Sequence, residues 1–192
     1  MPPTAGSSTA RSPEQPRFYY DLASPEAYLV AERALHALGE VPEWIPVRID
    51  EPGPFRCQEE VNSYMEDVER RARALGVMAL RWPDPFPADT EWAMLAATYA
   101  KQIGRGVAFS LAAFRQAFAA GRDLSERDNV LIAAAACEMH PAAVIKGAEL
   151  RGTREKLSAA TAQARAEGVR SLPAVVVGDR VLHGERAVPV AA

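Results

Sequence analysis

The sequence predicts an α/β fold in which a large all-helical block is inserted between two strand-containing ends. Three observations support this. Residues 17–49 show a strand, helix, strand pattern, residues 57–167 show helical periodicity, and residues 168–192 return to short apolar runs. A chain of 192 residues is long enough for one domain with a substantial core, or for a small domain that carries an insertion.

These patterns divide the chain into four parts. We expect a disordered leader over 1–16, an opening βαβ half over 17–56, a helical insertion with its linking helix over 57–167, and a closing β-hairpin half over 168–192.

The opening half begins with a short aromatic strand over residues 17–20, which leads into a capped helix. Ser24 offers a hydroxyl at the N-cap, Pro25 suits the first helical position, and Glu26 puts a negative charge in the first turn. Apolar residues then recur at helical spacing as far as Gly39, which predicts the end of the helix there.

The next strand is expected over residues 44–49. Pro46 inside it indicates an edge position or a bulge, because proline cannot donate to a sheet ladder. A strand, helix, strand unit of this length predicts a parallel pair with a right-handed crossover.

The central block is predicted to be helical throughout, apart from a proline-broken loop over residues 82–87. Ser125, followed by Asp128 three residues later, resembles a capping box. Helices are expected over 61–75, from Asp89 or Thr90 to Gly104 or Gly106, over 108–121, over 126–138, from Pro141, and over 153–167.

The closing half reads as a hairpin. Residues 175–177 and 180–183 are short apolar strands, and Gly178-Asp179 between them fits a two-residue type II′ turn.

Composition and charge argue against several classes of protein. Apolar residues make up 48% of the chain and the formal net charge is -3. This mild acidity, without a basic stripe, argues against nucleic acid as a partner. No apolar run approaches the roughly 18 residues that a membrane span needs, and the leader lacks the basic start and apolar stretch of a secretory signal. We therefore expect a cytoplasmic protein.

The cysteines and histidines show no metal-binding pattern. Cys57 and Cys137 lie far apart, which fits ordinary thiols in a reducing compartment. His36, His140 and His183 lack partners at ligand spacing, so no metal is expected.

Two segments at opposite ends of the chain carry a family resemblance. In residues 18–29 a strand runs into the helix that starts at Ser24-Pro25, and in residues 168–177 a helix stop precedes Leu172-Pro173 and a buried strand. Together they resemble the active site of the DsbA-like thioredoxin superfamily, and within it the branch of 2-hydroxychromene-2-carboxylate isomerases and kappa-class glutathione transferases. Redox-active relatives begin this helix with Cys-Pro-x-Cys, whereas this chain has Ser24-Pro25-Glu26-Ala27. The resemblance extends through Tyr28-Leu29, Tyr64-Met65 and the loop from Arg81 to Pro87.

The resemblance implies a thioredoxin-like fold and a thiol cofactor. Ser24 and Pro25 would hold the thiolate of glutathione or of another low-molecular-weight thiol, and Leu172 would pair with its cysteinyl part ahead of a cis peptide at Pro173. Relatives commonly carry a Gly-x-Asp-Arg run that holds the γ-glutamyl group, where this chain has Gly184-Glu185-Arg186. Relatives in this branch are often dimers, so a homodimer is also implied.

Each candidate residue also has a structural interpretation. Ser-Pro-Glu is a common helix start, so Ser24 could be a cap alone. Trp82 and Phe86 could line the substrate pocket or pack on the core, and the same alternatives hold for Tyr28. For Asp21 we expect packing or a contact that supports the site from behind, and for the charge run from Glu66 to Arg73 a solvated helix face.

Three functions stay open. The first is a thiol-dependent isomerase or transferase that acts on a small conjugated or aromatic-derived substrate, with Ser24 stabilising the cofactor thiolate. The second is a non-catalytic domain that binds a peptide or protein in the same groove. The third is a dithiol oxidoreductase, which Ser24 and Ala27 disfavour because neither supplies a sulfur.

Overall fold

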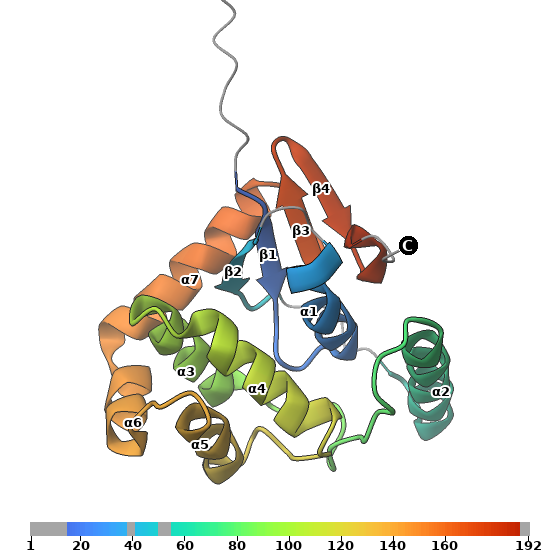
Figure 1. The fold of residues 1–192 in the computed structure, drawn as a ribbon, viewed down its shortest axis with the longest axis horizontal. Coiled ribbons are helices and arrows are strands. Elements are labelled where there is room, and N and C mark those ends of the chain that lie inside the picture. Colours follow the sequence, from blue (N-terminus) through green and yellow to red (C-terminus); the bar gives the residue numbers. More distant parts are fainter. Residues whose placement is uncertain (1–14, 38–40, 50–54, 189–192) are drawn as a thin grey trace, which may run out of the picture.

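A four-stranded sheet forms the centre of the upper part of the molecule in Figure 1, in the order β2-β1-β3-β4. The computed structural model describes residues 15–37, 41–49 and 55–188, and for residues 35–37 and 186 it describes the backbone alone. Nearly all of the expected leader and the helix end at Gly39 lie outside the described residues. The strands are β1 (Arg17–Tyr20), β2 (Glu43–Pro46), β3 (Ala174–Val177) and β4 (Arg180–His183).

The helices lie mostly between β2 and β3 in the chain, which confirms the predicted α/β class with a helical insertion. They are α1 (Pro25–Ala37), α2 (Gln58–Ala74), α3 (Glu91–Gln102), α4 (Gly106–Phe118), α5 (Arg127–Ala135), α6 (Pro141–Glu149) and α7 (Arg151–Ala166), followed at the end by the short 3-10 helix η1 (Glu185–Ala187).

Strand β1 is buried on both faces because helices cover both sides of the sheet. Its alternate side chains enter different clusters, as the two-residue period of a strand requires. Phe18 and Tyr20 join the large core that includes α1 and the helical block. Tyr19 joins a smaller cluster with Val169 of the segment after α7 and Val176 of β3.

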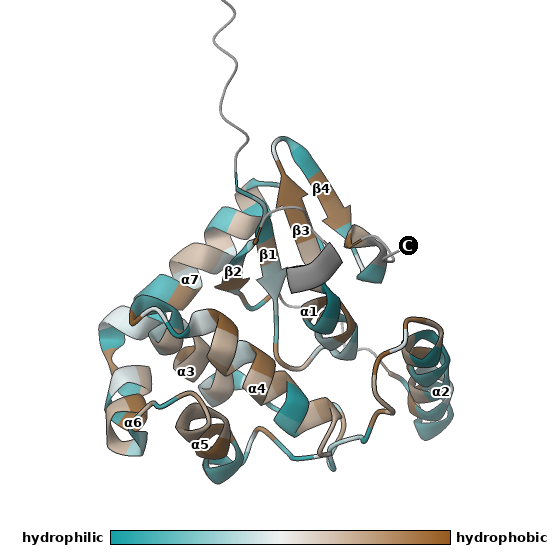
Figure 2. Cartoon of the chain, in the orientation of Figure 1, coloured by the Kyte–Doolittle hydropathy of each residue, from teal (hydrophilic) through white to brown (hydrophobic). Residues whose placement is uncertain are grey.

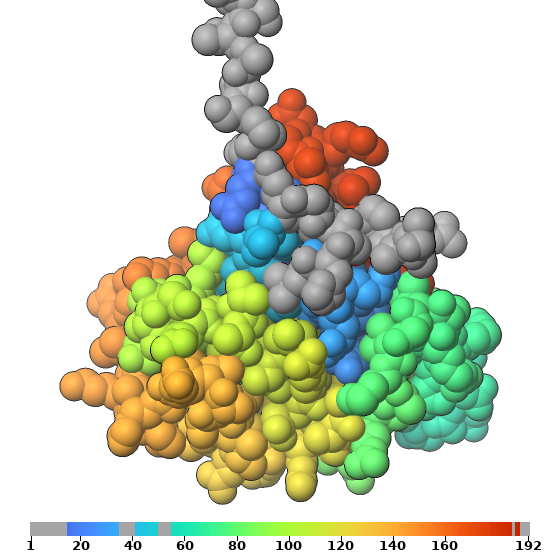
Figure 3. Space-filling model, viewed as in Figure 1, coloured from blue at the N-terminus to red at the C-terminus, as the bar shows by residue number. Residues whose placement is uncertain are grey.

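Aromatic packing joins the sheet half to the helical block. The ring of Tyr28 on α1 stacks on Phe118 of α4 with centroids 5.8 Å apart, and Tyr20 of β1 packs on Phe114 at 5.6 Å. In the space-filling view of Figure 3, α1 (blue) lies between α4 (yellow-green) and α2 (green). The core therefore runs through the boundary between the two predicted parts.

Helix α2 lies at the edge of the molecule in Figure 1, and most of its residues are coloured hydrophilic in Figure 2. Val68 and Ala72 are its buried residues. They are four residues apart, on the face toward the rest of the molecule. Their position matches the predicted amphipathic pattern.

Strand β2 is parallel to β1 and lies at the sheet edge, as Pro46 and the βαβ pattern predicted. It is shorter than predicted and ends at Pro46 instead of Ile49. The reason is the length of its partner, since β1 ends at Tyr20, directly opposite Pro46.

The predicted capping box at Ser125 is wrong. The Ser125 hydroxyl bonds to the Asp123 carboxylate at 2.5 Å, and the Ser125 N–H bonds to the other oxygen of Asp123 at 2.8 Å. Because the Ser125 hydroxyl is bonded within this local turn, it does not cap a helix. Helix α5 begins at Arg127, after Glu126, without a side-chain cap.

The hairpin turn agrees with its prediction. Gly178 has a φ of 58° while Asp179 does not share the positive φ, which is the pattern of a type II′ turn. Within the described part of the chain, no helix combines the length and apolar character needed to cross a membrane.

Candidate functional site

Strand pairing brings three distant segments together at one end of the sheet. Because β1 and β3 are antiparallel with Tyr19 opposite Ala174, the loop that follows β1 lies beside Leu172-Pro173, which precedes β3. Strand β4 pairs with β3 so that His183 lies opposite Ala174, which places Gly184 at the same end. The Gly184 N–H donates to the Pro173 carbonyl at 2.8 Å.

A cavity of about 470 Å³ opens at this convergence. Its walls come from the start of α1, the segments before β3 and after β4, helix α2 and the loop that follows α2. The lining residues are Asp21, Ala23, Ser24, Pro25, Glu26, Ile49, Phe55, Tyr64, Arg71, Phe86, Pro87, Ser171, Leu172, Gly184 and Glu185.

Ser24 caps α1 and lines the cavity. Its Oγ accepts the N–H of Ala27 at 3.1 Å, which is the predicted N-cap contact. A hydroxyl has one donor as well as two acceptor lone pairs, so capping leaves the Ser24 O–H available as a donor. The nearest described acceptor is Glu26 Oε2 at 3.5 Å, a weak contact. Ser24 can therefore cap the helix and donate to a ligand at the same time.

The peptide bond between Leu172 and Pro173 is cis, as the resemblance implied. Leu172 is half-buried and lines the cavity, whereas Pro173 is buried directly behind it. Ser24 and Leu172, from opposite ends of the chain, thus face one space.

Three aromatic rings form one wall of the cavity. Phe55 and Tyr64 have ring centroids 5.1 Å apart, and Phe86 lies 6.2 Å from each of them. Such a wall suits a planar apolar group, because aromatic pairs stack or meet edge to face at these distances.

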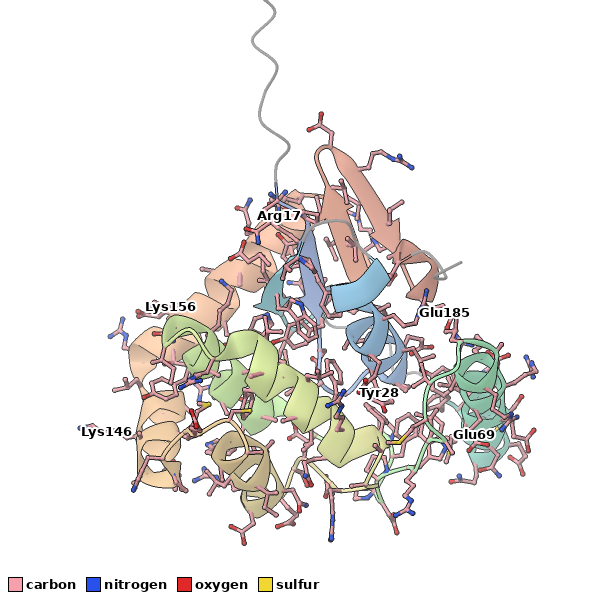
Figure 4. The ribbon with its side chains drawn as sticks, viewed as in Figure 1. Arg17, Tyr28, Glu69, Lys146, Lys156 and Glu185 are labelled. Carbon is pink, nitrogen blue, oxygen red and sulfur yellow. The ribbon has the colours of Figure 1, made fainter. Side chains whose placement is uncertain are left out.

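Arg71 joins three elements by ion pairs. Its guanidinium lies 3.3 Å from Glu26 of α1, 3.2 Å from Glu185 of η1 and 2.8 Å from Asp67 of α2. Figure 4 shows Glu185, the first residue of η1, on the side of α2. Burial alone would lower the pKa of Arg71, but the charges of Glu185 and Glu26 outweigh burial and raise it, so Arg71 is a permanent cation.

Asp21 lies at the end of β1, in the cavity wall. Burial raises the pKa of its carboxyl, and hydrogen bonds from the Ala23 N–H at 2.9 Å and the Thr90 hydroxyl at 2.8 Å offset part of this effect. Arg48 contributes a longer contact of 4.0 Å.

Most predicted site residues meet at this cavity. Ser24, Pro25, Leu172, Glu185 and Phe86 line it. Their contacts with a cofactor or substrate stay predictions.

Two predicted substrate contacts lie elsewhere. Tyr28 has 1% of its surface exposed because it lies on the inward face of α1, packed on α4, and it does not line the cavity. Trp82 packs on Phe86 from behind and donates its indole N–H to Glu69 at 2.8 Å. The core interpretation therefore describes Tyr28, and Trp82 supports the wall instead of forming it. The side chain of Arg186 lies outside the described residues.

Sequence reasoning missed Arg71, because it lies in the charge run that we expected to be a solvated helix face. That expectation is wrong for Arg71. A signal was present, since Arg71 follows the buried Val68 by three residues and Tyr64 by seven, the spacing of one helix face. Asp21, for which packing or a supporting contact was the expectation, lines the cavity itself.

The two cysteines lie outside the cavity wall. Cys57 is exposed and Cys137 is buried, both as free thiols, and burial raises the pKa of Cys137. Within the described ranges, no cluster of histidine, cysteine and acidic side chains could hold a metal ion.

A thiol fits part of this site. The positive end of α1 and the Ser24 hydroxyl suit a thiolate, and the cavity is large enough for a small molecule. The carboxylates of glutathione fit less well, because the cavity wall holds three acidic residues, Asp21, Glu26 and Glu185, and Arg71 already contacts two of them.

Solved structures share this fold. A 2-hydroxychromene-2-carboxylate isomerase superposes with a TM-score of 0.80 at 15% identity, over 90% of each chain. A probable DsbA oxidoreductase from Streptomyces coelicolor gives 0.72 at 20% identity, covering 89% of this chain and 83% of that one. The cytosolic disulfide reductase DsbM from Pseudomonas aeruginosa gives 0.64 at 15% identity, over 88% of each chain.

No curated protein sequence matches the chain. The family model of the DSBA-like thioredoxin domain, in contrast, matches residues 17–192, which include every strand and helix described above. The chain therefore belongs to the family of DSBA-like thioredoxin domains.

Proposed function

We propose that this protein is a thiol-dependent isomerase or transferase that acts on a small conjugated or aromatic-derived substrate. The observation that carries the proposal is that Ser24, at the capped start of α1, faces the same cavity as Leu172 and an aromatic wall, with no cysteine among the described lining residues. The overall likeness to a 2-hydroxychromene-2-carboxylate isomerase supports it.

The start of α1 is suited to stabilise a thiolate. A helix N-terminus favours an anion by about 0.3–1 kcal/mol when exposed and by up to about 2 kcal/mol when partly buried. One pKa unit corresponds to about 1.36 kcal/mol, so a bound thiol with an ordinary pKa of about 8.5 could fall toward about 7. The Ser24 O–H would add a charge-assisted hydrogen bond to the sulfur.

A bound thiol would supply a nucleophilic sulfur that adds reversibly to a conjugated carbonyl compound, without net oxidation or reduction. The residues of the chain would bind and orient the partners. Phe55, Tyr64 and Phe86 offer apolar surface to a planar substrate, and Ser24 with Leu172 lies beside the thiol position. Asp21, whose pKa is raised, is a candidate to hold a proton at the cavity wall.

The dithiol alternative draws less support from these contacts. A dithiol mechanism needs a cysteine at the helix start, where the chain has Ser24 and Ala27, and the exposed Cys57 and buried Cys137 do not line the cavity. A reducing, cytoplasmic location is part of our proposal, because both cysteines are free thiols.

Thermal unfolding in the presence of thiols tests the proposal. We would compare glutathione with its analogue in which both carboxylates are carboxamides, using the full chain and a phosphine reductant. A ligand at about 100 times its Kd stabilises a protein by about 2.7 kcal/mol, so at least one of these thiols should raise the Tm by several degrees. Ser24→Ala should lose most of this rise. Absence of any shift with both thiols would contradict the proposal, as would insulin reduction by the wild-type protein.

A further inference from the structure

We propose that the thiol bound in this cavity carries no free carboxylate, so that glutathione is a poor ligand and a neutral or cationic thiol is the preferred one. This inference rests on the proposed function and concerns the charge of the same cavity.

The cavity wall is acidic. Its described ionisable residues are Asp21, Glu26 and Glu185, against the single cation Arg71. Even with the carboxyl of Asp21 protonated, Glu26 and Glu185 outnumber the guanidinium. The part of the wall that the structure describes therefore offers a ligand more acceptors than positive charges.

Arg71 is already engaged by the protein's own acids. Its Nη1 lies 3.2 Å from Glu185 Oε2 and its Nη2 lies 3.3 Å from Glu26 Oε1, both as hydrogen-bonded ion pairs. Its Nε lies 2.8 Å from Asp67 Oδ2, close enough for an ion pair but without hydrogen-bond geometry. The side chains of Arg71, Glu26 and Glu185 are 27%, 20% and 19% exposed, so the pairs are shielded from water on most sides. A ligand carboxylate would have to displace one of these carboxylates to reach the guanidinium.

Two further cations contact residues of the cavity wall, Arg33 at the Glu185 carbonyl and Arg48 at Asp21, and both have other partners. Arg33 donates to the carbonyl of Val188 at 2.6 Å. Arg48 lies 4.0 Å from Asp21 and 3.9 Å from Asp89. Among the residues that the structure describes, the cavity thus has no cation that lacks an acidic or carbonyl partner and could serve a ligand carboxylate.

The positive end of α1 does not change this balance. A helix N-terminus acts as roughly half a positive charge, and its effect fades within the first turn. The thiolate beside Ser24 would use that charge. Each further negative charge on the ligand would meet Glu26 or Glu185, and we expect this repulsion to weaken binding by about tenfold, because like charges close together near a protein surface repel each other.

The same acidic wall suits ligand groups that donate hydrogen bonds. Hydroxyl, amide or ammonium groups on a thiol could donate to Glu26 and Glu185, whose carboxylates are acceptors only. An ammonium group could also lie over Tyr64 or Phe86, since aromatic faces attract cations. A small thiol that carries hydroxyls, amides or an amine therefore matches the wall.

Isothermal titration of the full chain with two probes tests the inference. The probes are glutathione and its analogue with both carboxylates converted to carboxamides, which have nearly the same shape and the same thiol. We expect the amidated analogue to bind at least about tenfold more tightly at low salt, and the ratio to shrink at high salt because screening weakens charge repulsion.

Two variants that each lack one negative charge test whether the acidic wall causes the weak binding of glutathione. Glu185→Gln should raise the affinity for glutathione about three- to tenfold, since it removes one negative charge from the wall and removes the ion-pair partner of Arg71 Nη1. Glu66→Gln removes the same charge from an exposed residue of α2 that does not line the cavity, and it should leave both affinities unchanged.

The outcomes separate this inference from the proposed function. If glutathione binds as tightly as the amidated analogue, or if Glu185→Gln leaves its affinity unchanged, the charge selectivity is wrong and the thiol-dependent function stands. If neither thiol binds, the proposed function falls, and this inference falls with it.

Discussion

The hydroxyl of Tyr64 on α2 donates to the carboxylate of Glu26, in the first turn of α1, at 2.5 Å. This bond and the ion pair between Glu26 and Arg71 hold the peripheral α2 over the start of α1. Helix α2 thereby contributes both an aromatic ring and a cation to a cavity whose other walls come from the sheet half and from the loop that follows α2.

Replacing Tyr64 by phenylalanine should loosen this contact while keeping the ring in the cavity wall. A hydrogen bond to a charged group contributes about 1.5–3 kcal/mol, and we expect a loss of about 1 kcal/mol in the free energy of unfolding because the site is partly exposed. Urea denaturation of Tyr64→Phe, of Glu26→Gln and of the double variant would give the coupling energy. A coupling energy near zero would mean that the bond does not stabilise the fold.

Ser24→Asp should separate the capping role of Ser24 from its proposed contact with a thiolate. Aspartate is as good an N-cap as serine, so the free energy of unfolding should stay within about 1 kcal/mol of wild type. Its negative charge should repel a thiolate, so thiol binding should weaken by at least about tenfold. Ser24→Thr keeps both cap and donor and should retain binding. Unchanged thiol affinity in Ser24→Asp would remove position 24 from the site.

Local patterns were sufficient to predict most of the fold. The aromatic run of β1, the Ser24-Pro25 start of α1 and the Gly178-Asp179 turn each have a local cause, so the sequence alone shows them. The capping prediction at Ser125 failed for a similar reason, because Asp123, only two residues away, competes for the same hydroxyl. The Ser125 hydroxyl could either cap the helix or bond to Asp123, and the sequence pattern does not show which of the two bonds forms.

The site was less predictable, because its walls meet only in three dimensions. Ser24 and Leu172 came from a family resemblance, and the antiparallel pairing of β1 with β3 explains why they meet. The role of α2 depends on long-range contacts, such as that between Tyr64 and Glu26, which no periodicity shows. Helical spacing groups Arg71 with Val68 and Tyr64, but it does not show that this face meets α1, so Arg71 looked like one charge among several on a solvated face.

Gly147 and Gly152 make a matched pair that tests the packing of the helical block. Replacing a helical glycine by alanine normally stabilises a protein by about 0.5–1 kcal/mol. At Gly147 of α6 the new methyl group would lie 2.3 Å from the ring of Tyr99 on α3, so we expect a loss of about 1–3 kcal/mol instead. At Gly152 of α7 nothing lies within 4 Å, so alanine should be neutral or stabilising. Equal thermal shifts for the two variants would contradict this packing.

The pH dependence of stability should reveal the raised pKa of Asp21. Because folding raises the pKa of this carboxyl through burial, the folded state binds its proton more tightly than the unfolded chain does. The resulting stabilisation is fully present below the unfolded pKa of about 3.9 and is lost as the pH rises through the folded pKa. Asp21→Asn keeps an oxygen to accept from Ala23 and Thr90 but has no proton to lose.

We therefore expect the Tm of Asp21→Asn, relative to wild type, to increase as the pH is raised from about 4 to about 8. Asp89→Asn is the matched control, because Asp89 shares the Arg48 contact but is 72% exposed, so this variant removes the same charge without removing a buried carboxyl. A relative Tm that is constant or that decreases across this range would mean that the folded protein does not hold Asp21 in its neutral form. Asp21 could then not serve as the proton-holding group of the cavity wall, and the chemistry there would depend on Ser24 and the helix end alone.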